Sequence, residues 1–285
     1  MASMRDIKRR KESVTSTQQI TKAMKLVSTV KLQKARGKAE ANKPYFNMLY
    51  DTICSILAKT KNVDHEYLRD NGSNKKAIIA ITSNRGLAGG YNNNIVKAIA
   101  GADFPKEDTY IYAIGKKGIE GLSRKGYSIY KDYSDIINAP LYSDATELTK
   151  QLLTQYGKGE IGEIYIAYTN FKNTVTQEPV LRKLLPISED DFSPERQDDK
   201  VLMNFEPSPE EVLEQVIPKY MSNIIFGAFL ESVASENGAR MQAMDSATSN
   251  AEDMISSLSL KYNRARQSAI TQELTEIIAG ADAIS

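Results

Sequence analysis

The N-terminal part of the chain has a pattern typical of a long, mostly polar helix. Residues 1–43 contain no proline and one glycine, and their apolar positions are sparse before Ala23 and dense from Met24 to Leu32. Pro44 predicts a bend, yet apolar residues then resume at helical spacing. We therefore expect a helix over residues 1–60. Because a helix that is polar over much of its length cannot bury that length against its own domain, part of it is expected to project.

Between residues 75 and 190 the pattern changes to short, continuous apolar runs of the kind found in buried strands. These runs alternate with segments that have helical spacing, which favours a Rossmann-like α/β domain with a parallel sheet. The expected strands are Ala77–Ile81, Tyr110–Ile114 and Glu163–Tyr168, with a further strand or edge at Val180–Pro186. The expected helices are Asn93–Ala100, Gly115–Lys125 and Thr146–Tyr156.

The last part of the chain carries the strongest periodic signal. An acidic, proline-containing stretch from Asp190 to Pro209 predicts a linker, after which Ser208 or Pro209 is expected to begin a final helix over residues 208–285. Neither glycine nor proline interrupts the stretch from Ala239 to Ala279. Steps of four and three residues define a heptad seam within it. Its members are Met244, Thr248, Ala251, Ile255, Leu258, Tyr262, Ala265 and Ala269.

Together these patterns predict the fold class. We expect an α/β protein in which the N- and C-terminal helices form a long antiparallel coiled coil and a Rossmann-like α/β domain is inserted between them. Small side chains at seam positions such as Ala251 and Ala265 allow two helices to approach closely. Residues 262–273, however, place polar groups on every face of the helix, which indicates contacts from several sides.

Composition and charge narrow the class of protein. The chain has 285 residues, of which 41% are apolar and 26% charged, as in ordinary soluble proteins. No apolar run reaches the roughly 20 residues of a membrane span, and no secretory signal follows the first basic residues. We therefore expect a cytoplasmic protein, although an organellar chain whose transit peptide has been removed would have the same pattern. The net charge is +1, yet residues 1–43 hold 12 Lys or Arg and only three acids. This segment therefore requires an acidic partner, which charge alone does not identify.

The sequence offers few residues that could form a catalytic, metal-binding or phosphate-binding site. Cys54 is the one cysteine and His65 the one histidine, so an internal disulfide is impossible and a zinc site is unsupported. The glycine-rich stretches 83–90 and 115–118 follow predicted strands but lack the spacing of phosphate-binding loops. We expect no catalytic residues, cofactor or metal. Two other classes stay open from the residues alone: a nucleotide-dependent enzyme built on the α/β segment, and a nucleic-acid-binding scaffold that uses the basic helix.

Several stretches resemble one known family. Residues 17–27, 236–244 and 262–274 are similar to signatures of F-type ATP synthase γ subunits of the bacterial type, the last two nearly residue for residue. The loop 84–90 resembles the family's D-R-G-L-C-G-G but differs at Asn84 and Ala88, which leaves the usual acid and cysteine without a counterpart. The resemblance covers essentially the whole chain, and neither alternative class explains it.

The resemblance implies a role and partners. Such a subunit is the central rotor of F1Fo ATP synthase, a non-catalytic shaft inside a ring of three α and three β subunits. Its α/β domain binds ε and the c-ring, so ion flow, of protons or sodium, is coupled to ATP synthesis or hydrolysis on β. The implied location is peripheral, on the cytoplasmic face of the bacterial membrane, with no nucleic acid bound. The sequence does not choose between the two ions or the two directions.

The resemblance also implies which residues contact partners. It places Met24 beside the lever region of β, and Arg266 and Gln267 at a loop of β that the rotor catches. Lys22 and Glu273 are implied to lie nearby. The acidic partner of the basic helix then includes carboxylates on β.

Overall fold

The structure is a computed structural model that describes residues 4–59, 65–187 and 208–282. Two helices at opposite ends of the chain, α1 (Met4–Lys59) and α5 (Pro209–Asp282), enclose an α/β segment in the sequence. The chain divides into two compact units, each of which takes part of both helices. The helical unit comprises Met1–Ser28 and Arg240–Ser285, and the α/β unit comprises Thr29–Ala239.

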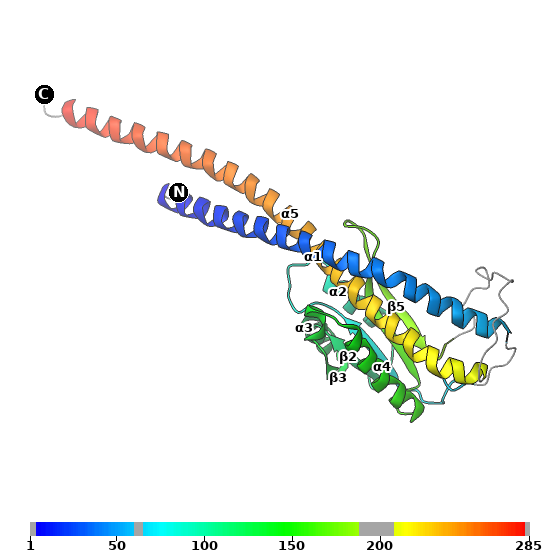
Figure 1. Cartoon of the computed structure of the whole chain (residues 1–285). Coiled ribbons are helices and arrows are strands. Elements are labelled where there is room, and N and C mark those ends of the chain that lie inside the picture. Colours follow the sequence, from blue (N-terminus) through cyan, green and yellow to red (C-terminus); the bar gives the residue numbers. More distant parts are fainter. Residues whose placement is uncertain (1–3, 60–64, 188–207, 283–285) are drawn as a thin grey trace. The chain divides into compact units, whose positions relative to one another are not determined.

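The α/β unit is built on a five-stranded sheet with the strand order β3-β2-β1-β4-β5 (Figure 1). Strands β1 (Lys76–Ile81), β2 (Thr109–Ile114), β3 (Ser128–Asp132) and β4 (Glu163–Phe171) run parallel to one another. Strand β5 (Gln177–Leu185) runs antiparallel to β4. The expected Rossmann-like α/β fold is therefore confirmed, with two corrections to the sheet.

The first correction concerns β3, which the sequence pattern did not reveal. This edge strand has only five residues, Ser-Ile-Tyr-Lys-Asp, and four of them are exposed, so it carries no apolar run. The second concerns β5, for which a parallel sheet was expected. Only a few residues separate β4 from β5, and a connection that short can form only an antiparallel hairpin.

Alternate side chains of β1 explain why its sequence is apolar throughout. Ile78 and Ala80 pack on one face of the sheet against α2 (Tyr91–Gly101) and α3 (Lys116–Arg124). Ile79 and Ile81 pack on the other face, with buried residues of α4 (Tyr142–Gly157) and of the parts of α1 and α5 that belong to this unit. Because both faces are covered by helices, the strand has no polar side to alternate with.

Each terminal helix is continuous over its described residues. Helix α5 starts at Pro209, and the Ser208 hydroxyl caps it by accepting a hydrogen bond from the Glu211 N–H at 3.2 Å. Helix α1 runs through Pro44, and α5 runs through Pro218. The expected linker lies almost wholly in 188–207, outside the described residues. A short 3-10 helix, Ile136–Asn138, precedes α4.

Candidate partner-binding surface on the terminal helices

Three side-chain contacts define how α1 and α5 pair in the helical unit. The hydroxyls of Thr21 and Thr248 lie 2.8 Å apart. The Gln18 amide donates to the Glu252 carboxylate at 3.0 Å, and the ammonium of Lys25 lies 2.6 Å from the Asp245 carboxylate. As the residue number rises along α1, it falls by about the same amount along α5. The helices are therefore antiparallel, as the fold class predicts, and run side by side in Figure 1.

The heptad positions of α5 are its least exposed positions over this length. Met244 and Ala251 are each 5% exposed. The other six positions are half-buried, whereas most residues between them are exposed. They are Thr248, Ile255, Leu258, Tyr262, Ala265 and Ala269.

Helix α1 contributes a matching seam that sequence reasoning missed. Its less exposed residues also recur at steps of three and four, but several are polar: Ile7, Lys11, Val14, Gln18, Thr21, Lys25 and Ser28. Thr21 is only 8% exposed and Ser28 only 3%. A search for apolar side chains overlooks such a seam. The signal that could have revealed it is the recurrence of small and long polar residues at the same heptad spacing as in α5.

The residues expected to contact β fall into two separate groups. Lys22 is exposed and Met24 half-buried, on the paired length of the helices. Arg266, Gln267 and Glu273 are exposed on α5, at or beyond the point where described residues of α1 end. Because Thr21 pairs with Thr248, Lys22 lies level with residue 247 of α5. At a rise of 1.5 Å per residue, residue 247 is about 28 Å along α5 from Arg266. The structure does not bring the two groups together.

Apolar side chains are also exposed on both helices of this unit. On α1, Ile20, Leu26 and Val27 are 60%, 64% and 58% exposed. Nothing in the sequence pattern alone distinguishes these three residues from apolar residues that are buried. On α5 every described side chain from Ile270 to Ala279 is exposed, including Leu274 and Ile277. Exposed apolar groups on successive turns of a helix are typical of a surface that contacts another protein.

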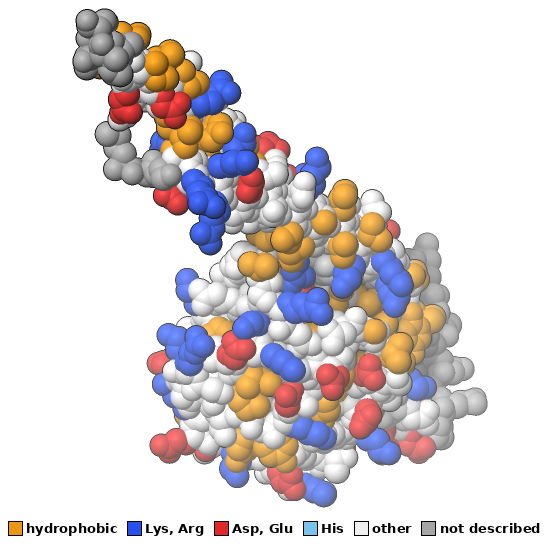
Figure 2. Space-filling model, turned by 90° about the vertical axis from the view of Figure 1, so that its left-hand side faces the viewer, with side chains coloured by type: hydrophobic (Ala, Val, Ile, Leu, Met, Phe, Trp, Pro, Cys, Tyr) orange, Lys and Arg blue, Asp and Glu red, His pale blue; other side chains and the backbone are white. Residues whose placement is uncertain are grey.

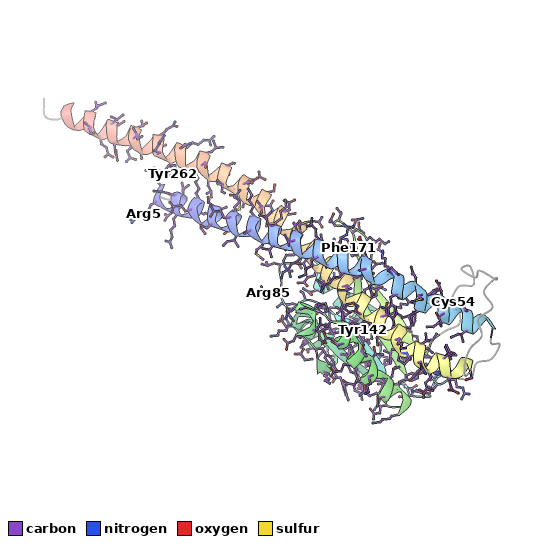
Figure 3. All side chains as sticks on the ribbon, viewed as in Figure 1. Arg5, Cys54, Arg85, Tyr142, Phe171 and Tyr262 are labelled. Carbon is purple, nitrogen blue, oxygen red and sulfur yellow. The ribbon has the colours of Figure 1, made fainter. Side chains whose placement is uncertain are left out.

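Polar groups of the glycine-rich loops in the α/β unit form hydrogen bonds with other residues of this chain. The Thr82 hydroxyl accepts the Gly118 N–H at 2.8 Å, and Gly115 adopts φ +109°, where an added Cβ would collide with the Thr82 carbonyl. The Asn84 side chain accepts the Lys116 N–H at 3.1 Å and donates to the Ser134 carbonyl at 2.7 Å. These loops therefore pack two strand ends together, and Arg85 on the first of them is exposed (Figure 3).

The single cysteine and histidine also have structural neighbours. Cys54 is half-buried and packs against the core beneath α1. His65 is buried, its Nδ1 accepts the Tyr67 N–H at 3.3 Å, and the two rings lie 5.0 Å apart. Among the described residues no cluster of His, Cys, Asp and Glu has a composition that could hold a metal ion. None of the described helices is long and apolar enough to cross a membrane.

One carboxyl group is held in an unusual environment in the α/β unit. Burial raises the pKa of Glu231, on α5, and the nearby Lys43 opposes that rise. Within the described part of the chain, the Oε2 atom of Glu231 is buried and has no hydrogen-bond partner. The same group contributes to the raised pKa of Tyr168, after the larger effect of burial.

Comparison with known proteins identifies the family. A family model described as ATP synthase matches residues 3–284. The ATP synthase gamma chain of Lachnoclostridium phytofermentans is 62% identical over the full length of both chains. The chain belongs to the ATP synthase gamma chain family. The resemblance noted in the sequence is thereby confirmed.

A further gamma chain and a solved structure are also similar to this chain. A gamma chain of Acetobacterium woodii, named as sodium ion specific, is 40% identical over 99% of each chain. A chain of the Euglena gracilis mitochondrial ATP synthase has a TM-score of 0.73 at 20% identity, over 99% of this chain and 94% of that one. At 20% identity, this structural similarity shows that the two chains share a fold.

Proposed function

We propose that this chain is the central rotor of an F1Fo ATP synthase, coupling proton or sodium flow through the c-ring to ATP synthesis or hydrolysis on the β subunits. The observation that carries the proposal is the 62% identity, over its entire length, to a gamma chain. The antiparallel helix pair of the helical unit, with exposed polar and apolar side chains, is the part suited to lie within a ring of α and β subunits.

The mechanism follows from symmetry. A single asymmetric helix pair inside a threefold ring presents a different face to each β subunit, so it cannot favour the same conformation in all three. Each catalytic site then has its own nucleotide affinity. Because coupling free energies are reciprocal, nucleotide binding also biases the angle of the rotor. The same coupling between rotor angle and nucleotide affinity therefore serves both synthesis and hydrolysis.

Within this proposal the exposed residues have distinct roles. Arg266 and Gln267 contact a loop of β at some rotor angles and not at others, with Glu273 nearby on the next turns of α5. Lys22 and Met24 contact β at a second level, well separated along the helices. The seam residues from Met244 to Ala269 hold α5 against α1 and so fix the faces that these contacts present.

The proposal also covers catalysis and location. The chain is a non-catalytic subunit, and the α/β segment, residues 75–190, binds ε and the c-ring. The assembly lies on the cytoplasmic face of the bacterial membrane, to which this chain is peripheral. The internal use of the glycine-loop polar groups supports this assignment over a nucleotide-dependent enzyme.

Co-purification tests the proposal directly. The chain, expressed with α and β subunits, is expected to elute with an α3β3 hexamer at one copy per hexamer, as a single central shaft requires. Calorimetry of the chain alone is expected to give no saturable binding of ATP, NAD or DNA at physiological salt. Absence of the chain from the hexamer, or micromolar binding of one of these ligands, would contradict the assignment.

A further inference from the structure

An amide pair joins α1 to α5 inside the α/β unit. The Nδ2 group of Asn42, on α1, donates a hydrogen bond to Oδ1 of Asn223, on α5, at 3.3 Å. Asn223 returns the bond, because its Nδ2 group donates to Oδ1 of Asn42 at 3.1 Å. The two side chains therefore form a closed ring of two hydrogen bonds, in which each amide is both a donor and an acceptor.

The amide pair lies where a polar group needs a partner within the protein. Charged side chains are spread over the surface of the α/β unit (Figure 2), where water can solvate them. Asn223, by contrast, is only 1% exposed, and Asn42 is half-buried. A buried amide that loses its hydrogen bonds is costly, whereas its net contribution to stability when paired is modest. The pair therefore acts mainly by penalising any arrangement that separates the two amides.

The apolar contacts around the pair lack this directionality. One turn further along α1, the ring of Phe46 stacks on that of Tyr220, with 5.8 Å between the centroids. Leu49 and Ile53 of α1 are buried in the same core as Ile217 of α5. Hydrophobic stabilisation scales with the apolar area buried and has no preferred direction. These contacts alone therefore do not select one axial register of α1 against α5.

A slide by one helical turn would leave the two amides without each other. Gly227 lies one turn after Asn223 on α5, and a Cβ added there would lie 3.7 Å from Nδ2 of Asn42. Moved onto that turn, Asn42 would face a residue with no side chain, and Asn223 would face the ring of Phe46. A slide in the opposite direction would set Asn42 against the exposed Lys219. Of these three registers, the observed one is the register that pairs both amides.

We propose that Asn42 and Asn223 are positioning residues that fix the axial register of α1 against α5, and that this register keeps ATP hydrolysis coupled to ion transport while the rotor works against a load. The inference rests on the proposed function, which supplies the load. Both helices continue from the α/β unit into the helical unit. A slide between them would change the faces that the pair presents to β, so a site would turn over without a full step of the rotor. Buried asparagines specify the register of coiled coils in the same way.

The first test replaces both amides by leucine, whose side chain has the same branching, in Asn42→Leu with Asn223→Leu. Each single variant leaves one buried amide unpaired and is expected to unfold at a lower temperature than wild type, whereas the double variant is expected to unfold at the same or a higher temperature. Spin labels on Asp51→Cys and Gln215→Cys, two exposed positions, report the register of the isolated full chain with Cys54→Ser. Wild type is expected to give one narrow distance and the double variant a second distance. One unchanged, narrow distance in the double variant would overturn the proposal.

The second test measures coupling in the complete ATP synthase, sealed in vesicles, as ions pumped per ATP hydrolysed against a rising opposing gradient. The double variant is expected to match wild type at low load. At high load its ratio is expected to fall to about half, because two registers of similar energy are both populated. A purely structural role of the pair predicts instead that the ratio follows the unfolding temperature and is lost in the single variants. That outcome, or a wild-type ratio at high load in the double variant, would overturn the proposal.

Asn47→Leu is the matched control, because Asn47 is exposed on the same helix five residues after Asn42. It is expected to keep the wild-type distance and the wild-type ratio at every load. A loss in the control equal to that in the double variant would overturn the assignment to the amide pair. A wild-type complex that hydrolyses ATP without pumping ions would contradict the proposed function, whereas the distances in the isolated chain test the register by themselves.

Discussion

The hydroxyl of Thr21 lies 2.8 Å from that of Thr248, in the seam between α1 and α5. Each hydroxyl is also within hydrogen-bond distance of a carbonyl on its own helix, Thr21 with Gln18 at 2.9 Å and Thr248 with Met244 at 2.7 Å. Two hydroxyl protons thus serve three contacts. One proton must point across the seam for the two helices to be joined at this level.

We expect the two threonines to be energetically coupled. Thr21→Val and Thr248→Val are each expected to lower the free energy of unfolding by about 0.5–1 kcal/mol, because each leaves one hydroxyl without its partner. The double variant is expected to cost less than the two single changes together, since it removes both polar groups. Urea unfolding of the four proteins measures the coupling. Thr17→Val, whose exposed hydroxyl bonds only its own helix, is the control and is expected to change little. Strict additivity of the two substitutions would refute the coupling.

Ala251 is a small, buried residue at a heptad position of α5. It is 5% exposed, so Ala251→Leu is expected to overpack the seam and cost about 1–3 kcal/mol. Ala265 is only half-buried and faces the end of the described part of α1, so Ala265→Leu is expected to cost less than about 1 kcal/mol. Denaturant unfolding of both variants checks this order. Equal costs would mean that the seam register is wrong.

The raised pKa of Glu231 makes one contribution to stability depend on pH. The folded chain binds this proton more tightly than the unfolded chain does. The contribution is therefore complete below the ordinary value near 4.5 and is lost as pH rises through the raised value. Glu231→Gln is expected to stabilise the protein at pH 8 by about 1 kcal/mol and to have little effect at pH 4. Thermal unfolding of the wild type and the variant at the two pH values measures this difference. An equal effect of the substitution at both pH values would show that titration of Glu231 does not contribute to stability.

Arg266 and Gln267 are expected to affect coupling more than folding. Both side chains are exposed, and the guanidinium offers a rigid fork of donors to a carboxylate on β. The double variant Arg266→Ala, Gln267→Ala is expected to assemble and to lose about one to two decades in ATP turnover. Lys158→Ala, on an exposed residue after α4, is the control. A double variant that assembles and retains full turnover would remove these residues from the β contact.

How far the sequence predicts the structure depends on the kind of pattern each element carries. The buried strand β1 was evident because both its faces are covered, whereas β3 was not, because most of its side chains are exposed. The α5 seam follows from its heptads, but the α1 seam includes Lys11, Gln18 and Lys25, which no search for apolar side chains finds. The pairing of Thr21 with Thr248 depends on the register of two distant segments, which periodicity in either one does not specify.

Rotation inside the ring tests the central claim most directly. The hexamer with this chain is fixed to a surface, Cys54 is replaced by Ser, and a probe is attached through a cysteine introduced at the exposed Lys106 of the α/β unit. The account predicts that ATP drives rotation of the probe in one direction, in steps of about 120°, because one asymmetric chain meets three equivalent β subunits in turn. Hydrolysis of ATP by the assembled hexamer without rotation of the probe would contradict it.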